Sequence, residues 1–164
     1  MKKYKWVIIV LNLVLLLVYF NYSVREKERL LKEGELVLLR LAPVDPRSLM
    51  QGDYMTLQYD ISTGISAKNI SKRGYCVVQL DSDGVANRVR FQDNLTPLNE
   101  GEILIKYTVP NDWDINIGAE SFFFQEGEAD KYEKAKYGGI KVDKEGNSLL
   151  IGLYDQDLTI IGNE

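Results

Sequence analysis

The feature that most constrains this chain is an apolar run near its N-terminus, from Trp6 to Tyr22. Only Asn12 and Asn21 are strongly polar within it. At a rise of 1.5 Å per residue, a helix of this length covers roughly 25 Å, close to the ~30 Å hydrocarbon core of a bilayer. Aromatic residues gather at both ends of the run, as they do in helices that end at membrane–water interfaces. The run therefore predicts a single transmembrane helix over residues 6–22.

The residues that flank this run indicate how it is oriented and whether it is retained. Three lysines and no acidic residue precede it, so the positive-inside rule places the N-terminus in the cytoplasm. A cleaved signal peptide is the alternative, but cleavage requires small residues after the apolar run, and Tyr19–Tyr22 are bulky. We therefore expect an uncleaved anchor in a bacterial-type inner membrane, with the rest of the chain on the periplasmic side. The expected division is a signal anchor over 1–24, a charged stalk over 25–34 that could continue the helix, and an extracytoplasmic domain over 35–164.

The composition of the remaining chain excludes several classes of function. The whole sequence has 20 Lys and Arg against 24 Asp and Glu, and three of the lysines precede the apolar run, so the remainder carries a net charge of -7. Such an acidic domain is not expected to bind nucleic acid or to lie on anionic lipid. There is no histidine, which excludes Ser-His-Asp catalysis and histidine-based zinc sites. Cys76 is the sole cysteine and lies in an apolar run, so we expect a buried, unreactive thiol. The sequence gives no reason to expect a metal or an organic cofactor.

From Glu35 onward, the apolar residues mostly alternate with polar ones or form short runs between turn-forming residues, which is the pattern of β-strands. The pattern predicts a mainly β domain, either a small partly closed barrel or a two-sheet sandwich, since both protect strand edges. The clearest alternation begins at Tyr54, with Met55, Leu57, Tyr59 and Ile61 expected on one face. The expected strands are Glu35–Leu41, Tyr54–Ile61, Tyr75–Leu80, Val85–Phe91, Ile103–Val109, Ser121–Gln125, Ile140–Val142, Ser148–Tyr154 and Leu158–Ile161.

Local signals add two turns and one helix to this prediction. The segments 80–85 and 142–147 each contain an Asp followed three residues later by a Gly, which indicates hairpin turns with the glycine at positive φ. Segment 127–137 has Ala129, Tyr132 and Ala135 at helical spacing, with acidic residues early and lysines late. We expect it to form one short helix that ends at the following pair of glycines.

The segment from Leu41 to Tyr59 joins the first two expected strands and is unusually rich in chain-stiffening and charged residues. Pro43 and Pro46 cannot donate ladder hydrogen bonds, and Asp45 and Ser48 can close local turns. A purely structural interpretation is a rigid crossover loop, in which Arg47 pairs with a nearby carboxylate. The alternative is that the same residues form a site.

This segment resembles the GDYXXLXY family of bacterial membrane-anchored proteins. The resemblance rests on Gly52-Asp53-Tyr54 with Leu57 and Tyr59, on Pro43–Arg47, and on Phe123–Gly127, and it extends over most of the chain. It implies no particular reaction. It implies an accessory protein that works beside a polytopic membrane protein.

An enzymatic interpretation has to work without histidine. The best alternative is a Ser/Lys hydrolase that resembles signal peptidases, in which Ser48 lies before Gly52-Asp53 and a buried lysine acts as base. Lys106 is the one lysine within an expected apolar strand, and it would need burial to lower its pKa. The segment Asp81–Gly84 slightly resembles a calcium-binding loop, but position 90 is Arg where an EF-hand places a glutamate, so a turn is preferred.

A binding role demands less of the residues, and it is the function that we expect. Tyr54 and Tyr59 should lie on opposite faces of their strand, so that one lines the core and the other can join Gln58 in a contact surface. We also expect charged residues of the two family-like segments to converge at one end of the domain. The candidate binding residues are Asp45, Arg47, Asp53, Tyr54, Gln58, Tyr59 and Glu126, and the expected partner is a polytopic inner-membrane protein.

Overall fold

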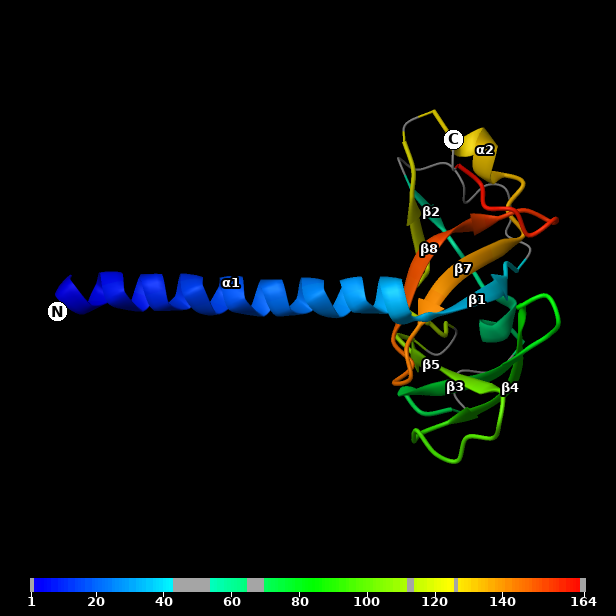
Figure 1. The fold of residues 1–164 in the computed structure, drawn as a ribbon, viewed down its shortest axis with the longest axis horizontal. Helices are drawn as coiled ribbons and strands as arrows, with labels where there is room; N and C mark the ends of the chain where they lie inside the picture. Colours follow the sequence, from blue (N-terminus) through cyan, green and yellow to red (C-terminus); the bar gives the residue numbers. More distant parts are fainter. Residues whose placement is uncertain (1, 43–53, 65–69, 112–113, 126, 163–164) are drawn as a thin grey trace.

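The computed structural model describes residues 2–42, 54–64, 70–111, 114–125 and 127–162. A helix, α1 (Lys2–Glu33), runs without interruption from the N-terminus to the domain, so the stalk continues the helix of the apolar run. Figure 1 shows α1 projecting from one side of the β domain as a free rod. Among the described residues, α1 is the one helix long and apolar enough to cross a membrane, and the domain buries none of its apolar stretch.

The end of α1 is held against the domain by packing and by one hydrogen bond from β7. Gly34 stops the helix, and its N–H donates to the carbonyl oxygen of Leu30 at 2.9 Å. The Leu30 side chain is buried, and Lys141 Nζ donates to the Gly34 carbonyl oxygen at 2.8 Å. Because these contacts hold both sides of the junction, the direction of α1 sets the orientation of the domain.

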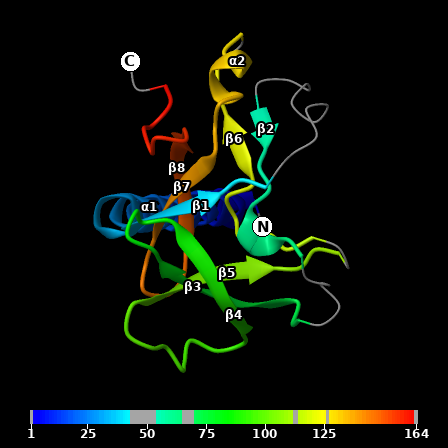
Figure 2. The same cartoon turned by 90° about the vertical axis from the view of Figure 1, so that its right-hand side faces the viewer.

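The domain contains three antiparallel sheets in its described part, and no closed barrel (Figure 2). One sheet has the order β1-β7-β8, a second has the order β4-β3-β5, and β2 pairs with β6 alone. The predicted mainly β fold behind one N-terminal helix is therefore confirmed. The strands are β1 (Glu35–Arg40), β2 (Tyr54–Thr56), β3 (Arg73–Leu80), β4 (Ala86–Gln92), β5 (Glu102–Thr108), β6 (Ser121–Phe123), β7 (Tyr137–Val142) and β8 (Ser148–Tyr154).

One hydrophobic core joins the three sheets. Its fully buried members include Leu39, Val78, Ile105 and Ile140, which come from strands of both three-stranded sheets. Cys76 also lies in this core, and burial raises the pKa of its thiol to about 12, so the prediction of a buried thiol is confirmed. Each sheet buries one face against the others, as expected for a small layered domain.

Both predicted hairpin turns are confirmed, and the same pattern of aspartate hydrogen bonds closes both. Asp81 Oδ1 accepts hydrogen bonds from the backbone N–H groups of Asp83 and Val85, each at 3.0 Å. Asp143 Oδ1 does the same for Glu145 and Asn147, at 3.0 and 2.8 Å. Glycines at φ 77° and φ 82° complete the two turns. An aspartate in such a turn satisfies backbone donors that the tight bend would otherwise leave unpaired.

Several predicted element boundaries are wrong. The helix expected over residues 127–137 is a single turn, α2 (Ala129–Tyr132), and the glycine pair expected to end it lies inside β7. The strand expected over Tyr54–Ile61 ends at Thr56, and a short 3-10 helix, η2, occupies Asp60–Ser62. In place of the last expected strand, Ile160 makes a single bridge to Tyr154. The glycine pair lies inside β7 because that strand pairs with both β1 and β8, whereas local hydrogen bonds close η2 and the turn before Ile160.

Candidate interaction surface

The segment 54–61 alternates between buried and exposed side chains along its whole length, although only its start is a strand. Met55, Leu57, Tyr59 and Ile61 are buried, and the residues between them are exposed. The predicted division into an inward and an outward face is confirmed. The two tyrosines of the segment therefore differ in role: Tyr59 lies in the core and Tyr54 lies on the surface.

Tyr59 belongs to the folding core. Its hydroxyl donates a 2.6 Å hydrogen bond to the carbonyl oxygen of Ala119, and its ring packs beside the backbone of Gly138. Burial raises the pKa of this hydroxyl far above its ordinary value, and the negative charge of Glu120 adds to the shift. A fully buried side chain cannot touch a partner, so Tyr59 can support a contact surface but not form part of one.

The loop that receives the Tyr59 hydroxyl is itself held in place. The Glu120 carboxylate accepts hydrogen bonds from the backbone N–H groups of Ile117 and Gly118, and the Ser148 hydroxyl donates to the Ile117 carbonyl oxygen at 2.7 Å. The N–H of Leu57 donates to the Glu120 carbonyl oxygen at 2.7 Å. These bonds connect the start of β6 to the chain that follows β2, and they fix the position of the two strands.

Two aromatic side chains lie opposite one another on the outer face of the paired strands β2 and β6, and we call them the aromatic pair. Tyr54 of β2 is directly opposite Phe123 of β6 in the strand register, and the ring centroids are 5.8 Å apart. Tyr54 is 44% exposed and Phe123 is 73% exposed. The next pair in the register, Met55 and Phe122, faces the core instead. The aromatic pair is an exposed apolar feature outside α1, and Gln58 lies exposed nearby in the sequence.

The strand that carries Phe123 can be placed relative to α1. In Figure 1, β6, the yellow strand, runs along the side of the domain from which α1 leaves.

Four other predicted binding residues cannot be placed relative to the aromatic pair. Asp45, Arg47, Asp53 and Glu126 lie outside the described residues, so their expected convergence remains a prediction. Phe123 was not among the predicted binding residues. Its signal was present in the sequence as three consecutive phenylalanines at 122–124, because an alternating strand cannot bury all three on one face.

The geometry around the hydrolase candidates gives no support to that alternative. Ser48 lies outside the described residues. Lys106 is exposed, and its Nζ donates to Asn147 Oδ1 at 2.6 Å. Within the described ranges no three His, Cys, Asp or Glu side chains gather as metal ligands would.

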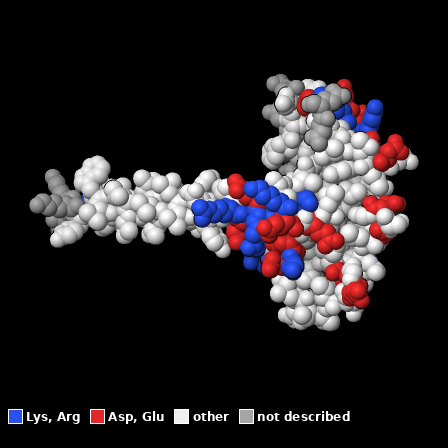
Figure 3. Space-filling view, in the orientation of Figure 1, with Lys and Arg blue, Asp and Glu red and all other residues white. Residues whose placement is uncertain are grey.

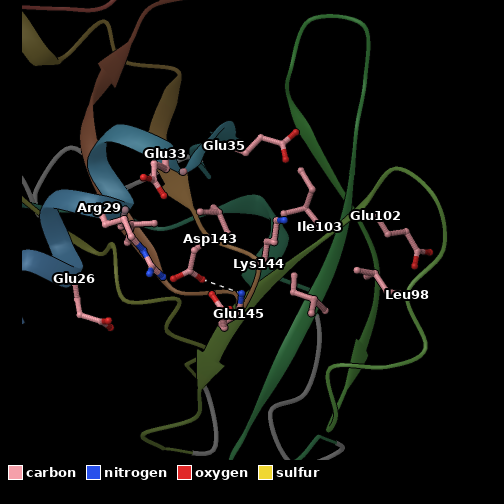
Figure 4. Close-up of a pocket in the computed structure, with 14 residues that line it drawn as sticks. Glu26, Arg29, Glu33, Glu35, Leu98, Glu102, Ile103, Asp143, Lys144 and Glu145 are labelled. Atoms are coloured by element: carbon pink, nitrogen blue, oxygen red, sulfur yellow. Dashed lines mark hydrogen bonds between the residues drawn. The ribbon is translucent and has the colours of Figure 1, made fainter.

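A groove of about 570 Å³ lies where α1 joins the domain (Figure 4). Figure 3 shows basic and acidic side chains mixed at this junction, while the preceding part of α1 is white. Two of the carboxylates are already engaged: Glu102 pairs with Arg90, and Asp143 closes its turn. These two carboxylates therefore already have partners within the domain. The charged side chains that line the groove are Glu26, Arg29, Glu33, Glu35, Glu102, Asp143, Lys144 and Glu145.

The fold and the surface define a class of protein: a compact β domain carried on a long, mostly apolar helix. Comparison with family models is consistent with this class, because the model described as GDYXXLXY protein matches residues 16–153. The chain belongs to the GDYXXLXY family. No curated protein matches the chain, and no solved structure does.

Proposed function

We propose that this protein is a membrane-anchored binding subunit that holds its β domain outside the cytoplasmic membrane and contacts a membrane-protein partner through the aromatic pair. On this proposal it acts by binding and not by catalysis. The observation that carries the proposal is the exposed Tyr54–Phe123 pair, whose strand β6 runs along the side of the domain from which α1 leaves (Figure 1).

The exposure of α1 supports the anchor. Its leucine, isoleucine and valine side chains between Val7 and Val18 are largely exposed, and no part of the described domain covers them. An apolar surface of that extent is far larger than the patches that soluble monomers expose. A bilayer would bury it, and the lysines before it favour a cytoplasmic N-terminus.

The length of the stalk favours a protein partner over the lipid surface. Residues 23–33 are helical, so at 1.5 Å per residue they hold the domain about 16 Å beyond the end of the predicted span. The headgroup region extends only about 5–8 Å from the hydrocarbon core. The aromatic pair would therefore lie above the lipid, at the height of the loops that a neighbouring membrane protein raises from the bilayer.

The chemistry of the pair also suits a protein contact. Tyrosine and phenylalanine are enriched in the cores of protein interfaces, where a few aromatic side chains supply much of the binding energy. Because hydrogen bonds fix the strands that carry them, less conformational entropy is lost on binding.

The test is recovery of a partner from native membranes solubilised in mild detergent. The full chain with Tyr54→Ser and Phe123→Ser should lose a membrane protein that the wild-type chain retains. Val89→Ser is the matched control, since Val89 is 48% exposed but lies on β4 in another sheet. Recovery of the wild-type chain alone, or equal partner recovery with the double variant, would refute the proposed contact.

A further inference from the structure

The two asparagines of α1 differ in whether the helix satisfies them. Asn21 Nδ2 donates to the carbonyl oxygen of Leu17 at 2.9 Å. Asn12 is exposed, and its carboxamide makes no hydrogen bond to any residue that the structure describes. The described part of the domain does not supply a partner, because α1 projects away from it (Figure 1).

The position of Asn12 along the helix makes this difference costly. Within the span of the proposed anchor, Asn12 lies about 9 Å from Trp6 and about 15 Å from Tyr22 along the axis. That depth is inside the hydrocarbon core, where no water reaches an amide. Asn21 lies beside the end of the span, at the membrane interface. Of the two, Asn12 is the side chain that needs a partner from outside its own helix.

We propose that α1 associates side by side with a second copy of this chain through an Asn12–Asn12 hydrogen bond within the membrane. A carboxamide carries both a donor and an acceptor, so two copies satisfy each other. Copies inserted with the same orientation place Asn12 at the same depth, which a chance neighbour would not. The inference rests on the membrane anchor of the proposed function.

The rest of the helix face and the domain allow this pairing. Ile8, Leu15, Leu16 and Tyr19 lie at the spacings that share a helix face with Asn12, and they supply apolar packing on either side of it. Figure 2, viewed from the domain side, shows the domain end of α1 near one edge of the domain. Straight helices that cross at about 20° near Asn12 diverge toward the domains, which leaves room for both.

The experiment measures association of the full chain in phosphatidylcholine vesicles. Copies carry donor or acceptor dyes on a cysteine introduced by Asp157→Cys, an exposed turn position, while the native Cys76 is buried. Energy transfer is followed as the lipid-to-protein ratio rises. Asn12→Leu should weaken the dimer about 3- to 30-fold, as expected for one interhelical hydrogen bond.

Two further variants make the result specific. Asn21→Leu removes the other asparagine, which lies on the opposite side of the helix, and should leave association unchanged. Asn12→Gln keeps a donor and an acceptor and should retain most of it.

The possible failures separate the two proposals. A chain that resists alkaline extraction from cell membranes but gives no energy transfer at any ratio would overturn the dimer and leave the anchor standing. Equal association of wild type and Asn12→Leu would also overturn it. Release of the chain from the membranes by alkaline extraction would overturn the anchor and the dimer together.

Discussion

Gly138 in β7 gives a direct test of how the core is packed. A Cβ atom at this position would lie 2.8 Å from Tyr59 Cε1 and 3.0 Å from the Tyr59 hydroxyl oxygen. Both residues are buried, and the tyrosine is held by its hydrogen bond to Ala119. Gly138 is not among the glycines with positive φ, so its backbone would accept alanine. The obstacle is space alone.

The expected effect of Gly138→Ala is the difference between two opposing terms. Replacing a strand glycine by alanine lowers the entropy of the unfolded chain and favours folding by about 0.5–1 kcal/mol. Forcing a methyl group into a packed core costs about 1–3 kcal/mol. The steric term wins, because the ring cannot move without breaking its hydrogen bond. The free energy of unfolding should fall by about 1–2 kcal/mol, which is roughly 4–8 °C in melting temperature for a domain of this size.

The assay is thermal unfolding of the full chain in detergent micelles, followed by near-ultraviolet circular dichroism, which reports aromatic side chains and not the helical backbone of α1. Tyr59→Leu removes the ring, so Gly138→Ala should cost measurably less in that background. A higher melting temperature for Gly138→Ala, or an equal cost in both backgrounds, would refute the steric account.

Two further predictions concern titration. Arg90 donates hydrogen bonds of 2.5 and 2.8 Å to the Glu102 carboxylate, and together with the Asn99 N–H this lowers the pKa of Glu102 to about 2. Because the folded pKa lies below the unfolded value of about 4.3, the stabilisation is complete above that pH and is lost as the pH falls toward 2. Glu102→Gln should flatten the dependence of melting temperature on pH in this window, and Glu100→Gln, an exposed neighbour, should not; identical profiles for both variants would contradict the assignment. Because burial raises the pKa of Cys76 to about 12, a thiol reagent at pH 8 should modify it only after denaturation, and rapid labelling of the folded chain would contradict that burial.

The sequence predicted features whose cause is local. The alternation over 54–61 follows from the two-residue period of an extended chain, so Tyr59 could be assigned to the face opposite Tyr54 without a structure. The Asp–Gly turns follow from a side chain that bonds its own neighbouring backbone. The sequence left open whether the charged stalk continues the helix of the apolar run, and the structure shows that it does.

Features set by distant contacts could not be predicted. Gly138 and Gly139 follow a helical pattern, but the structure uses them to make room for the rings of Tyr59 and Tyr154, which lie elsewhere in the chain. Three phenylalanines in a row require that one faces outward, but only the register of β6 with β2 identifies it as Phe123. The sequence of either strand alone does not determine that register.

The two faces of β2 and its continuation explain why an exposed aromatic pair is better understood as a contact than as part of the fold. The inward residues Leu57 and Tyr59 already join this segment to the core and to the loop at Ala119. A cross-strand aromatic pair adds only about 0.5–1.5 kcal/mol beyond the area it buries, and this pair leaves much of its area in water. Folding therefore gains little from a phenylalanine that is 73% exposed. A partner that covered it would gain the burial that the domain leaves unused.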